Sequence, residues 1–416
     1  MIFTAAPGAF RQVLAAYAVS CYGNYLNLIA LGLFTLRVTG SPFGLGALMA
    51  ARLLAGVVMG LAAGALVSRL DRRKLMITTD VVQAGAMTTT AVLAFTAANA
   101  VVPLAVSMVL LGAGNTLFTV ALRSSVPGLA GDAGPAGLNG LLVTARSIAT
   151  VLGFASAGFV VGAWGFGIAF ALNGLTFVFS ALVLARVRFE PDAGRVVKAS
   201  RPRTSVLPEV FGSLVVVMVV VRGLDAFGSA SHNVALPVQA ASVAPAAPSA
   251  YLSWFWAAWA VGGLMAHPLS RWLVPRVRAD LVFPVATAVM SVAFVLTFCG
   301  WQAPITAAVA LVAGIADGVG EIAFTTRLQA EPEDRRGHLF GLAATAETTG
   351  FGVGMVTSAA VLEVLPAPAV VGLFHSCALV AAVVLLSRVT FRRPRAAEEN
   401  EERTDGVLPR SRARAD

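Results

Sequence analysis

The stretch GALVSRLDRRK, residues 64–74, places four cationic side chains within eleven residues, between two long apolar segments. Each flanking segment is long enough to cross a lipid bilayer, which requires roughly 20 apolar residues. Basic residues concentrate in the loops of membrane proteins that stay in the cytoplasm. We therefore expect residues 64–74 to form a cytoplasmic turn that lies against the membrane surface.

The composition of the whole chain favours lipid as its main solvent. Of its 416 residues, 57% are hydrophobic and 12% are charged, whereas soluble domains carry about 25% charged residues. A soluble protein of this composition would expose large apolar patches, which cause aggregation. Twelve spanning helices would need about 240 residues, which is close to the hydrophobic share of the chain.

The formal net charge of +9 does not indicate a nucleic-acid-binding protein. Such a protein presents a basic face on a soluble domain, and the sequence contains no segment of that kind. The positive-inside rule accounts for the basic excess instead. The expected partners are the lipid bilayer, a small-molecule substrate and protons, with no nucleic acid, and we expect a monomer.

Apolar run lengths predict an all-α integral membrane protein with twelve transmembrane helices. Long continuous runs argue against strands, because only helices and closed barrels satisfy the backbone in lipid. The expected spans are 10–36, 43–67, 75–97, 101–123, 138–163, 166–186, 209–231, 250–273, 281–300, 303–327, 338–364 and 367–388.

Basic residues occur in alternate loops, with Arg37 as the exception. An even number of spans then puts both termini on the basic, cytoplasmic side. The Ala-, Val-, Gly- and Arg-rich composition favours a bacterial source, so the expected location is the bacterial plasma (inner) membrane.

The polar stretch after the sixth span predicts two pseudo-symmetric six-helix halves. We expect an N-terminal half at 1–186, a cytoplasmic linker at 187–208, a C-terminal half at 209–390 and a disordered cytoplasmic tail at 391–416.

The two halves also resemble each other in sequence. NGLLVTARSIATVLG (139–153) aligns with FGLAATAETTGFGVG (340–354), and this alignment places Arg146 opposite Glu347. Secondary transporters use such internal repeats to build a midplane site between two rocking halves.

GALVSRLDRRK resembles the loop between spans 2 and 3 of the major facilitator superfamily, whose pattern is Gly-x-Leu-Ala-Asp-Arg-x-Gly-Arg-Arg. GNYLNLIALGLFTLRVTGSP (23–42) and LQAEPEDRRGHLFGL (328–342) resemble the branch that contains the enterobactin exporter and related drug exporters. The resemblance covers all twelve spans. It implies the major facilitator fold with alternating access, no enzymatic activity and no cofactor.

The same resemblance implies proton-coupled efflux of an amphipathic small molecule, such as a drug, a siderophore or a secondary metabolite. The alternatives are an importer or uniporter of a small solute, and a non-transporting sensor. No Walker loop, catalytic triad or metal-binding constellation supports an enzyme.

The basic loop is expected to act in gating. Gly64, Arg69, Arg72 and Arg73 match the family pattern. Ser68 and Asp71 occupy pattern positions with a different residue. Ser68 replaces the family's acid, which closes the cytoplasmic gate near span 11, and Asp71 is the alternative acid. Asp80 and Arg123 are placed like the family's partner acid and base, so we expect them to contact each other. The other interpretation is that all these charges only anchor the topology.

Several ionisable residues fall inside the predicted spans, where they are costly unless they face a cavity or pair with each other. They are Arg52, Arg146, Arg222, Asp225, Asp317, Glu321 and Glu347. Asp317 and Glu321 are four residues apart on one helical face, and two close carboxylates resist simultaneous ionisation. We therefore expect them to carry the coupled proton, with Asp225 and Glu347 as further candidates. The alternative is a structural pair of carboxylates that Arg146 or Arg222 neutralises.

The remaining expectations concern contacts among these charges and polar residues of the spans. Arg222 is expected to pair with Asp225, and Arg52 with Glu347 across the interface of spans 2 and 11. Candidate substrate-cavity residues are Asn24, Asn27 and Asn115, with helix–helix hydrogen bonding as the alternative. Aromatic residues at the start of span 8 either form an interfacial belt or stack on a ligand; they are Trp254, Phe255, Trp256 and Trp259.

Overall fold

The computed structural model describes residues 7–96, 101–129, 134–187 and 214–391, and within these ranges every regular element is a helix. These helices are α2 (Gly8–Thr39), α3 (Pro42–Arg69), α4 (Arg72–Thr96), α5 (Val101–Leu129), α6 (Gly134–Arg186), α8 (Leu214–Val243), α9 (Pro248–Leu273), α10 (Ala279–Thr297), α11 (Ala303–Gln329), α12 (Glu333–Val361) and α13 (Ala367–Phe391).

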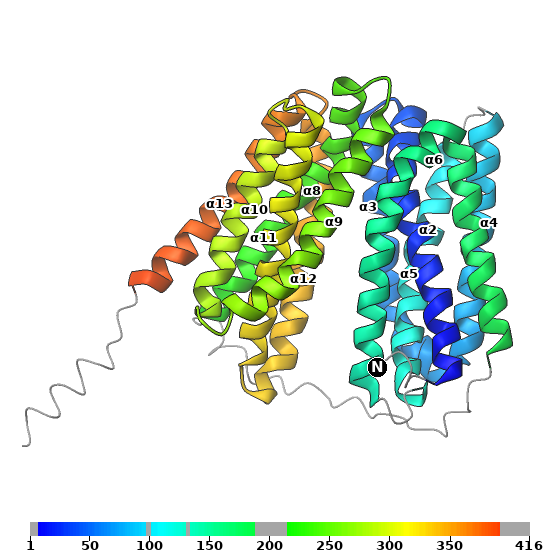
Figure 1. Cartoon of the computed structure of the whole chain (residues 1–416), viewed down its shortest axis with the longest axis horizontal. Coiled ribbons are helices and arrows are strands. Elements are labelled where there is room, and N and C mark those ends of the chain that lie inside the picture. The colour runs from blue at the N-terminus through cyan, green and yellow to red at the C-terminus, as the bar shows by residue number, and fades with distance from the viewer. Residues whose placement is uncertain (1–6, 97–100, 130–133, 188–213, 392–416) are drawn as a thin grey trace, which may run out of the picture.

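Helix α6 consists of two spans joined at Gly165. Gly165 has φ 79° and ψ 177°, a backbone conformation that is accessible to glycine and strained for other residues. The chain reverses there, so α6 runs from the end of the molecule near the N-terminus to the opposite end and back (Figure 1). We call this opposite end the far end. The described residues thus contain twelve spans, as the run lengths predict, and the expected boundary between 138–163 and 166–186 coincides with Gly165.

The composition of the helices agrees with a multi-pass membrane protein. Nine of the described helices are long and apolar enough to cross a membrane. Helices α4 and α9 fall outside that group, but α4 packs against α5 and α6, and α9 packs against α11 and α6. Both helices are therefore packed within the protein beside candidate spans.

The predicted end of the seventh span was wrong by twelve residues. Helix α8 continues from the expected limit at residue 231 to Val243. The expected limit is followed by the polar residues His232 and Asn233. The structure buries His232, and a polar residue that is enclosed by other helices does not end a span.

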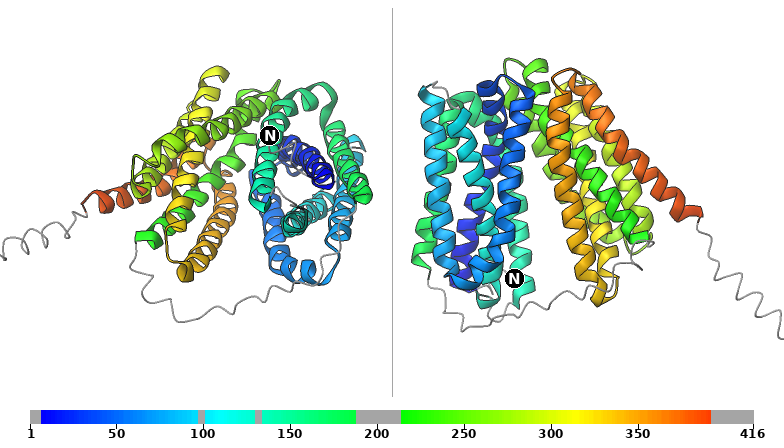
Figure 2. Two further views of the ribbon diagram at one scale, coloured as in Figure 1. Left: turned by 60° about the horizontal axis from the view of Figure 1, so that its bottom comes forward. Right: turned by 180° about the vertical axis from the view of Figure 1, so that it is seen from behind.

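The helices form two bundles, α2–α6 and α8–α13 (Figures 1 and 2). Except for Val187 and Phe391, the expected linker (187–208) and tail (391–416) lie outside the described residues. Val187 is buried directly after α6, and Phe391 is the last residue of α13.

Three clusters of buried apolar residues show how the bundles meet. The largest contains residues of both bundles, including Phe34 and Phe170 from the first and Phe255 and Phe374 from the second. The other two clusters each belong to one bundle and lie toward the end of the molecule where the chain begins. The bundles therefore share a core at the far end and are separate at the end near the N-terminus (Figure 2).

Polar contacts add to the closure at the far end. The Ser249 hydroxyl of α9 donates to the carbonyl of Gly158 in α6 at 3.3 Å. Glu363, just after α12, accepts from the Ser41 hydroxyl at 2.5 Å and from the Phe43 N–H at 2.9 Å. Its carboxylate thus lies at the N-terminus of α3, where the helix dipole favours negative charge. These two donors lower the pKa of Glu363 below its usual value.

Candidate functional site

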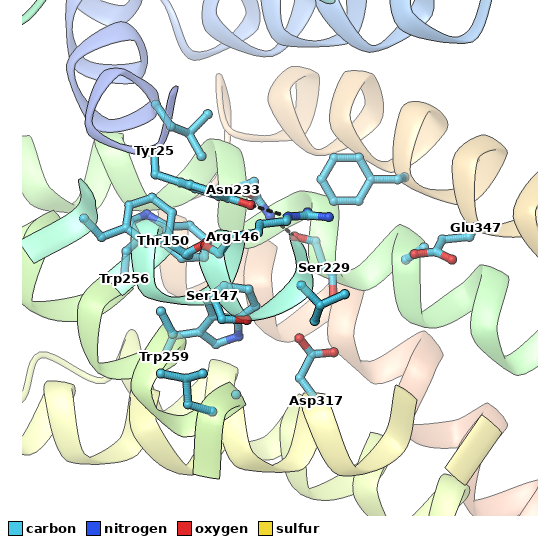
Figure 3. A pocket seen from close by; sticks show the side chains of 18 of the residues that line it. Tyr25, Arg146, Ser147, Thr150, Ser229, Asn233, Trp256, Trp259, Asp317 and Glu347 are labelled. Atoms are coloured by element: carbon cyan, nitrogen blue, oxygen red, sulfur yellow. Dashed lines mark hydrogen bonds between the residues drawn. The ribbon is translucent and has the colours of Figure 1, made fainter. Parts of the chain in front are cut away.

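A cavity of about 810 Å³ lies between the two bundles and contains most of the predicted intramembrane charges. Its N-terminal wall consists of side chains from α2, α5 and α6, and its C-terminal wall of side chains from α8 to α12 (Figure 3). Small-molecule sites typically have volumes of about 300–1,000 Å³. The cavity is therefore large enough for a small organic molecule.

The N-terminal wall carries positive charge only. Among the described residues its charged members are Arg123 and Arg146, and no carboxylate lines it. The Nε–H of Arg146 donates to the Tyr25 hydroxyl at 2.9 Å. Figure 3 shows the guanidinium of Arg146 held beside Tyr25, with Ser147 and Thr150 of the same helix nearby.

The C-terminal wall concentrates negative charge around one arginine, which we call the Arg222 cluster: Arg222, Asp225, Glu321 and Glu347. Arg222 Nη2 lies 2.6 Å from Glu321 Oε2 and 3.2 Å from Glu347 Oε1, and Nη1 lies 3.3 Å from Asp225 Oδ2. The Arg222 side chain is only 13% exposed. The expected Arg222–Asp225 pair is thus present, within a larger group that also includes helices α11 and α12.

Asp317 is one turn from Glu321 on α11 but is not part of the ion pairs of this cluster. Asp317 lines the same cavity as Arg222. Among the described residues it forms no salt bridge of its own. The two expected proton carriers thus differ, because Glu321 is paired with Arg222 and Asp317 is unpaired and faces the cavity (Figure 3).

The expected contact between Arg52 and Glu347 was wrong. Glu347 pairs with Arg222 because α12 packs closely along α8. Arg52 instead lines an adjoining cavity of about 490 Å³, together with Asn115 and Asn233. Of the three candidate cavity asparagines, Asn115 thus lines a cavity.

The other two asparagines do not line either cavity. Asn27 is fully buried, and both atoms of its amide are without a hydrogen-bond partner among the described residues. On the same helix, Tyr25 and Leu28 line the larger cavity instead. The polar character of Asn24 and Asn27 suggested a cavity-facing side, but the sequence does not show how α2 is rotated.

The aromatic residues of α9 divide between the two interpretations according to helix face. Trp254 is 67% exposed on the outer surface, and Phe255 is buried. Trp256 and Trp259 line the cavity, where Trp256 stacks on Phe154 of the other bundle at 5.6 Å between ring centroids. The outward ring fits an interfacial belt, and the two inward rings form an aromatic surface.

A histidine pair was missed because its members are 143 residues apart in sequence. His232 Nδ1 and His375 Nε2 are 3.1 Å apart, and His232 stacks on Phe294 at 3.7 Å. His232 also lines the cavity. The available signal was an ionisable side chain inside an apolar run. No group of three His, Cys, Asp or Glu that could hold a metal exists among the described residues.

The basic loop makes its contacts within the first bundle. Arg72 Nη1 donates to the Ser124 carbonyl at 2.7 Å, and Arg73 donates to the carbonyls of Leu184 and Ala185 at the end of α6. Basic side chains near unpaired helix-end carbonyls are stabilising. These two arginines therefore fasten the start of α4 to α5 and α6.

The other residues of the loop have local roles in this conformation. Asp71 accepts from the Lys74 N–H at 2.9 Å and caps α4, whereas the Ser68 hydroxyl donates to Ala65 within α3. Arg69 is exposed, and a methyl group at Gly64 would meet no atom within 4 Å. Gating through this loop stays a prediction.

The expected contact between Asp80 and Arg123 was also wrong. Asp80 is fully buried and faces the Ser180 hydroxyl of α6, whereas Arg123 is exposed on the N-terminal wall of the cavity. No salt bridge joins them within the described part of the chain. They point in different directions because α4 turns Asp80 toward α6, away from the end of α5.

Comparisons with known proteins identify the fold. The model of the Major Facilitator Superfamily matches residues 13–329. The nucleoside transporter NupG has a TM-score of 0.70 with 13% identity, covering 93% of this chain and 100% of its own.

Two further solved structures have the same architecture. A bacterial homologue of the iron transporter ferroportin, in its inward-facing state, has a TM-score of 0.71 with 16% identity and covers 91% of this chain and 98% of its own. The inward-open xylose transporter XylE from E. coli has a TM-score of 0.67 with 15% identity, covering 92% and 96%. No curated protein sequence matches the chain.

Proposed function

Because the chain belongs to the Major Facilitator Superfamily, a family of transporters, we propose that it couples proton movement to the transport of an amphipathic small molecule. The proposed direction is efflux across a bacterial plasma membrane, as the resemblance of residues 23–42 and 328–342 to drug and siderophore exporters implies. Alternating access of the cavity between the bundles moves the substrate.

The observation that carries this proposal is the excess of carboxylates around Arg222. One guanidinium is paired with Asp225, Glu321 and Glu347, and Asp317 lines the same cavity, one helical turn from Glu321. Full ionisation would put four negative charges beside one positive charge. Like charges in a low-dielectric site favour uptake of a proton by one of the groups. A group that gains and loses a proton inside the cavity is what proton coupling requires.

The conformation supports alternating access. The bundles are closed together at the far end and separate near the N-terminus, so the cavity opens on one side only. With the termini on the cytoplasmic side, as the positive-inside rule predicts, this state faces inward. Rocking of the two bundles about the cavity would then produce the outward-facing state.

Proton-coupled import is the second candidate, and Arg146 favours it. An unpaired cation on the N-terminal wall suits an anionic substrate. An anion in the cavity favours protonation of the facing carboxylates, so anion and proton would bind together, as in symport. Efflux driven by inward proton flow requires the two to bind alternately.

The test is mass spectrometry of cells and medium from strains that carry the wild type, no protein, Asp317→Asn, or Glu331→Gln at equal expression. Glu331 is a matched control, because its carboxylate pairs with Arg327 after α11 and is outside the cavity. We expect one compound to move to the medium with the wild type and with Glu331→Gln, and not with Asp317→Asn.

Three other outcomes contradict the proposal in different ways. Accumulation of the compound inside the cells would establish import. Equal transport by Asp317→Asn would remove this residue from proton coupling. Absence of any redistributed compound, in either direction, would favour a non-transporting sensor.

A further inference from the structure

The charge distribution in the cavity points to a specific ligand chemistry. The only charged residues of the N-terminal wall among those described are Arg123 and Arg146. The carboxylates Asp225, Asp317 and Glu347 line the C-terminal wall, where Arg222 pairs with two of them. Positive charge on the first bundle is therefore left without a carboxylate partner.

Arg146 is held in position but is not neutralised. Its Nε–H donates to the Tyr25 hydroxyl, which is a neutral acceptor. No salt bridge to Arg146 occurs among the described residues, so both terminal NH2 groups remain available. A guanidinium presents parallel N–H donors that match a carboxylate in a bidentate arrangement. Because Tyr25 restrains the guanidinium, less conformational entropy is lost when an anion binds.

An aromatic surface extends from the same position across the interface. Tyr25 meets Phe154 edge to face at 5.3 Å, and Phe154 stacks on Trp256 at 5.6 Å. Trp256 in turn meets Trp259 at 5.5 Å. Tyr25 and Phe154 belong to the first bundle and the tryptophans to the second, so a flat ligand here would contact both bundles (Figure 3).

We propose that Arg146 binds the anionic group of an aromatic ligand whose rings pack on Trp256 and Trp259. Tyr25 is a positioning residue that orients the guanidinium. The inference rests on the proposed use of this cavity for transport, and of the two directions it favours proton-coupled import, because an anion and a proton would bind together. It names the substrate class as aromatic carboxylates or chemically similar aromatic anions.

The test is isothermal titration calorimetry of the purified full-length protein in lipid nanodiscs with four probes. They are 1-naphthoate, 1-naphthalenemethanol, 1-naphthylmethylammonium and acetate, so that charge and rings are varied separately. We expect 1-naphthoate to bind most tightly. No binding of 1-naphthoate at millimolar concentration, or equal or tighter binding of the neutral or cationic probe, would overturn the proposal; equal binding of acetate would overturn its aromatic part.

The variants test which residues are responsible. Arg146→Gln should weaken 1-naphthoate binding about 10- to 100-fold, as expected for lost hydrogen bonds to a charged group. Arg146→Lys should recover part of the affinity, because it retains the charge without the planar fork. Tyr25→Phe should cause a smaller loss and leave the preference for the anion intact.

Arg186→Gln is the matched control, because Arg186 lies at the end of the same helix and outside the cavity. It should bind 1-naphthoate like the wild type. Unchanged affinity of Arg146→Gln would disprove the site even if the protein transports. Conversely, anion binding at Arg146 without any proton-coupled flux would disprove the proposed function and leave the binding site standing.

Discussion

At the residue scale, Arg222 is the centre of the C-terminal wall. The sequence identified its neighbour on the same helix, Asp225, because three residues of separation place both on one face. The partners from α11 and α12 are 99 and 125 residues away, and only the packing of three helices brings their carboxylates to one guanidinium. The Arg222 side chain is 13% exposed, whereas those of Glu321 and Glu347 are about half exposed.

This difference in exposure predicts a difference in stability. Arg222→Gln should lower the free energy of unfolding by roughly 2–4 kcal/mol, because it leaves carboxylates unpaired in a partly dry site. Glu347→Gln should cost under about 1 kcal/mol, because its half-exposed carboxylate is already solvated. Thermal and denaturant unfolding of the purified variants would measure both values.

A change of pH provides the control for this comparison. Lowering the pH should partly restore the stability of Arg222→Gln, because protonation removes the charge that the arginine compensated. If the two variants are equally stable, or if acid fails to restore Arg222→Gln, the cluster does not have the electrostatic role described above.

At the element scale, close helix packing replaces the hydrophobic driving force that is absent in lipid. Helices α9 and α11 approach so closely that a methyl group at Gly314 would lie 2.0 Å from the Trp259 carbonyl oxygen. Small residues permit this approach in membrane proteins. Helices α3 and α5 in the first bundle meet in the same way, because a methyl group at Gly112 would lie 2.0 Å from the Arg52 carbonyl oxygen.

Gly314→Ala should therefore force α9 and α11 apart and destabilise the protein by about 1–3 kcal/mol, the usual cost of overpacking. Gly372→Ala in α13 is the matched control, because a methyl group there meets no atom within 4 Å. It should be neutral or slightly stabilising, since alanine is favoured over glycine within a helix. Unfolding measurements on both variants decide the point, and equal losses would refute the packing argument.

The second prediction at the element scale concerns the contact of Glu363 with the start of α3 and its dependence on pH. Because its two donors lower the pKa of Glu363, the contact is fully formed above the usual glutamate pKa of about 4.3 and is lost as the pH falls through the lowered value. At neutral pH, Glu363→Gln should weaken this contact as acid does. The two bundles should therefore separate at the far end more often.

Spin labels at the ends of α3 and α9 near the N-terminal side would report this opening. Leu70 and Trp272 are suitable exposed positions, with the exposed Cys299 and Cys377 replaced by serine. Rocking that opens the far end brings the bundles together near the N-terminus. The distance between the labels should therefore shorten in Glu363→Gln. An unchanged distance distribution would show that Glu363 does not hold the far end closed.

At the scale of the whole molecule, the internal repeat places unlike charges at equivalent positions. Arg146 of α6 and Glu347 of α12 correspond in the two halves, and both line the cavity from opposite walls. Each contacts the neighbouring helix of its own bundle, Arg146 through Tyr25 of α2 and Glu347 through Arg222 of α8. The two halves of the fold thus contribute one cationic wall and one carboxylate-rich wall to the cavity.

The sign of the pH dependence of ligand binding should therefore reveal the mode of coupling. If the affinity for 1-naphthoate rises as the pH falls, anion and proton bind together and the protein is a symporter. If the affinity falls with pH, they compete, as proton-driven efflux requires. Calorimetric titrations at several pH values measure this sign, and Asp317→Asn should reduce the pH dependence in both cases. An undiminished pH dependence in that variant would place the proton elsewhere.

The sequence by itself determined the number of spans, the alternation of basic loops and the presence of charges inside the membrane. These properties depend on local composition, because the bilayer requires long apolar helices and penalises each buried charge separately. Even the reversal within α6 was predicted closely, since the apolar runs are interrupted at the glycine that the turn requires.

The tertiary structure alone decided which charges of different helices meet, which faces line the cavity and which end is open. Glu347, the expected partner of Arg52, pairs with Arg222 instead. Asp80 and Arg123 point in different directions. The physical reason is that a partner is chosen by helix rotation and packing between segments that are distant in sequence. A span that is apolar on several faces does not reveal that rotation, so a partner on another helix could not be predicted from the sequence, whereas Asp225, on the same helix as Arg222, could.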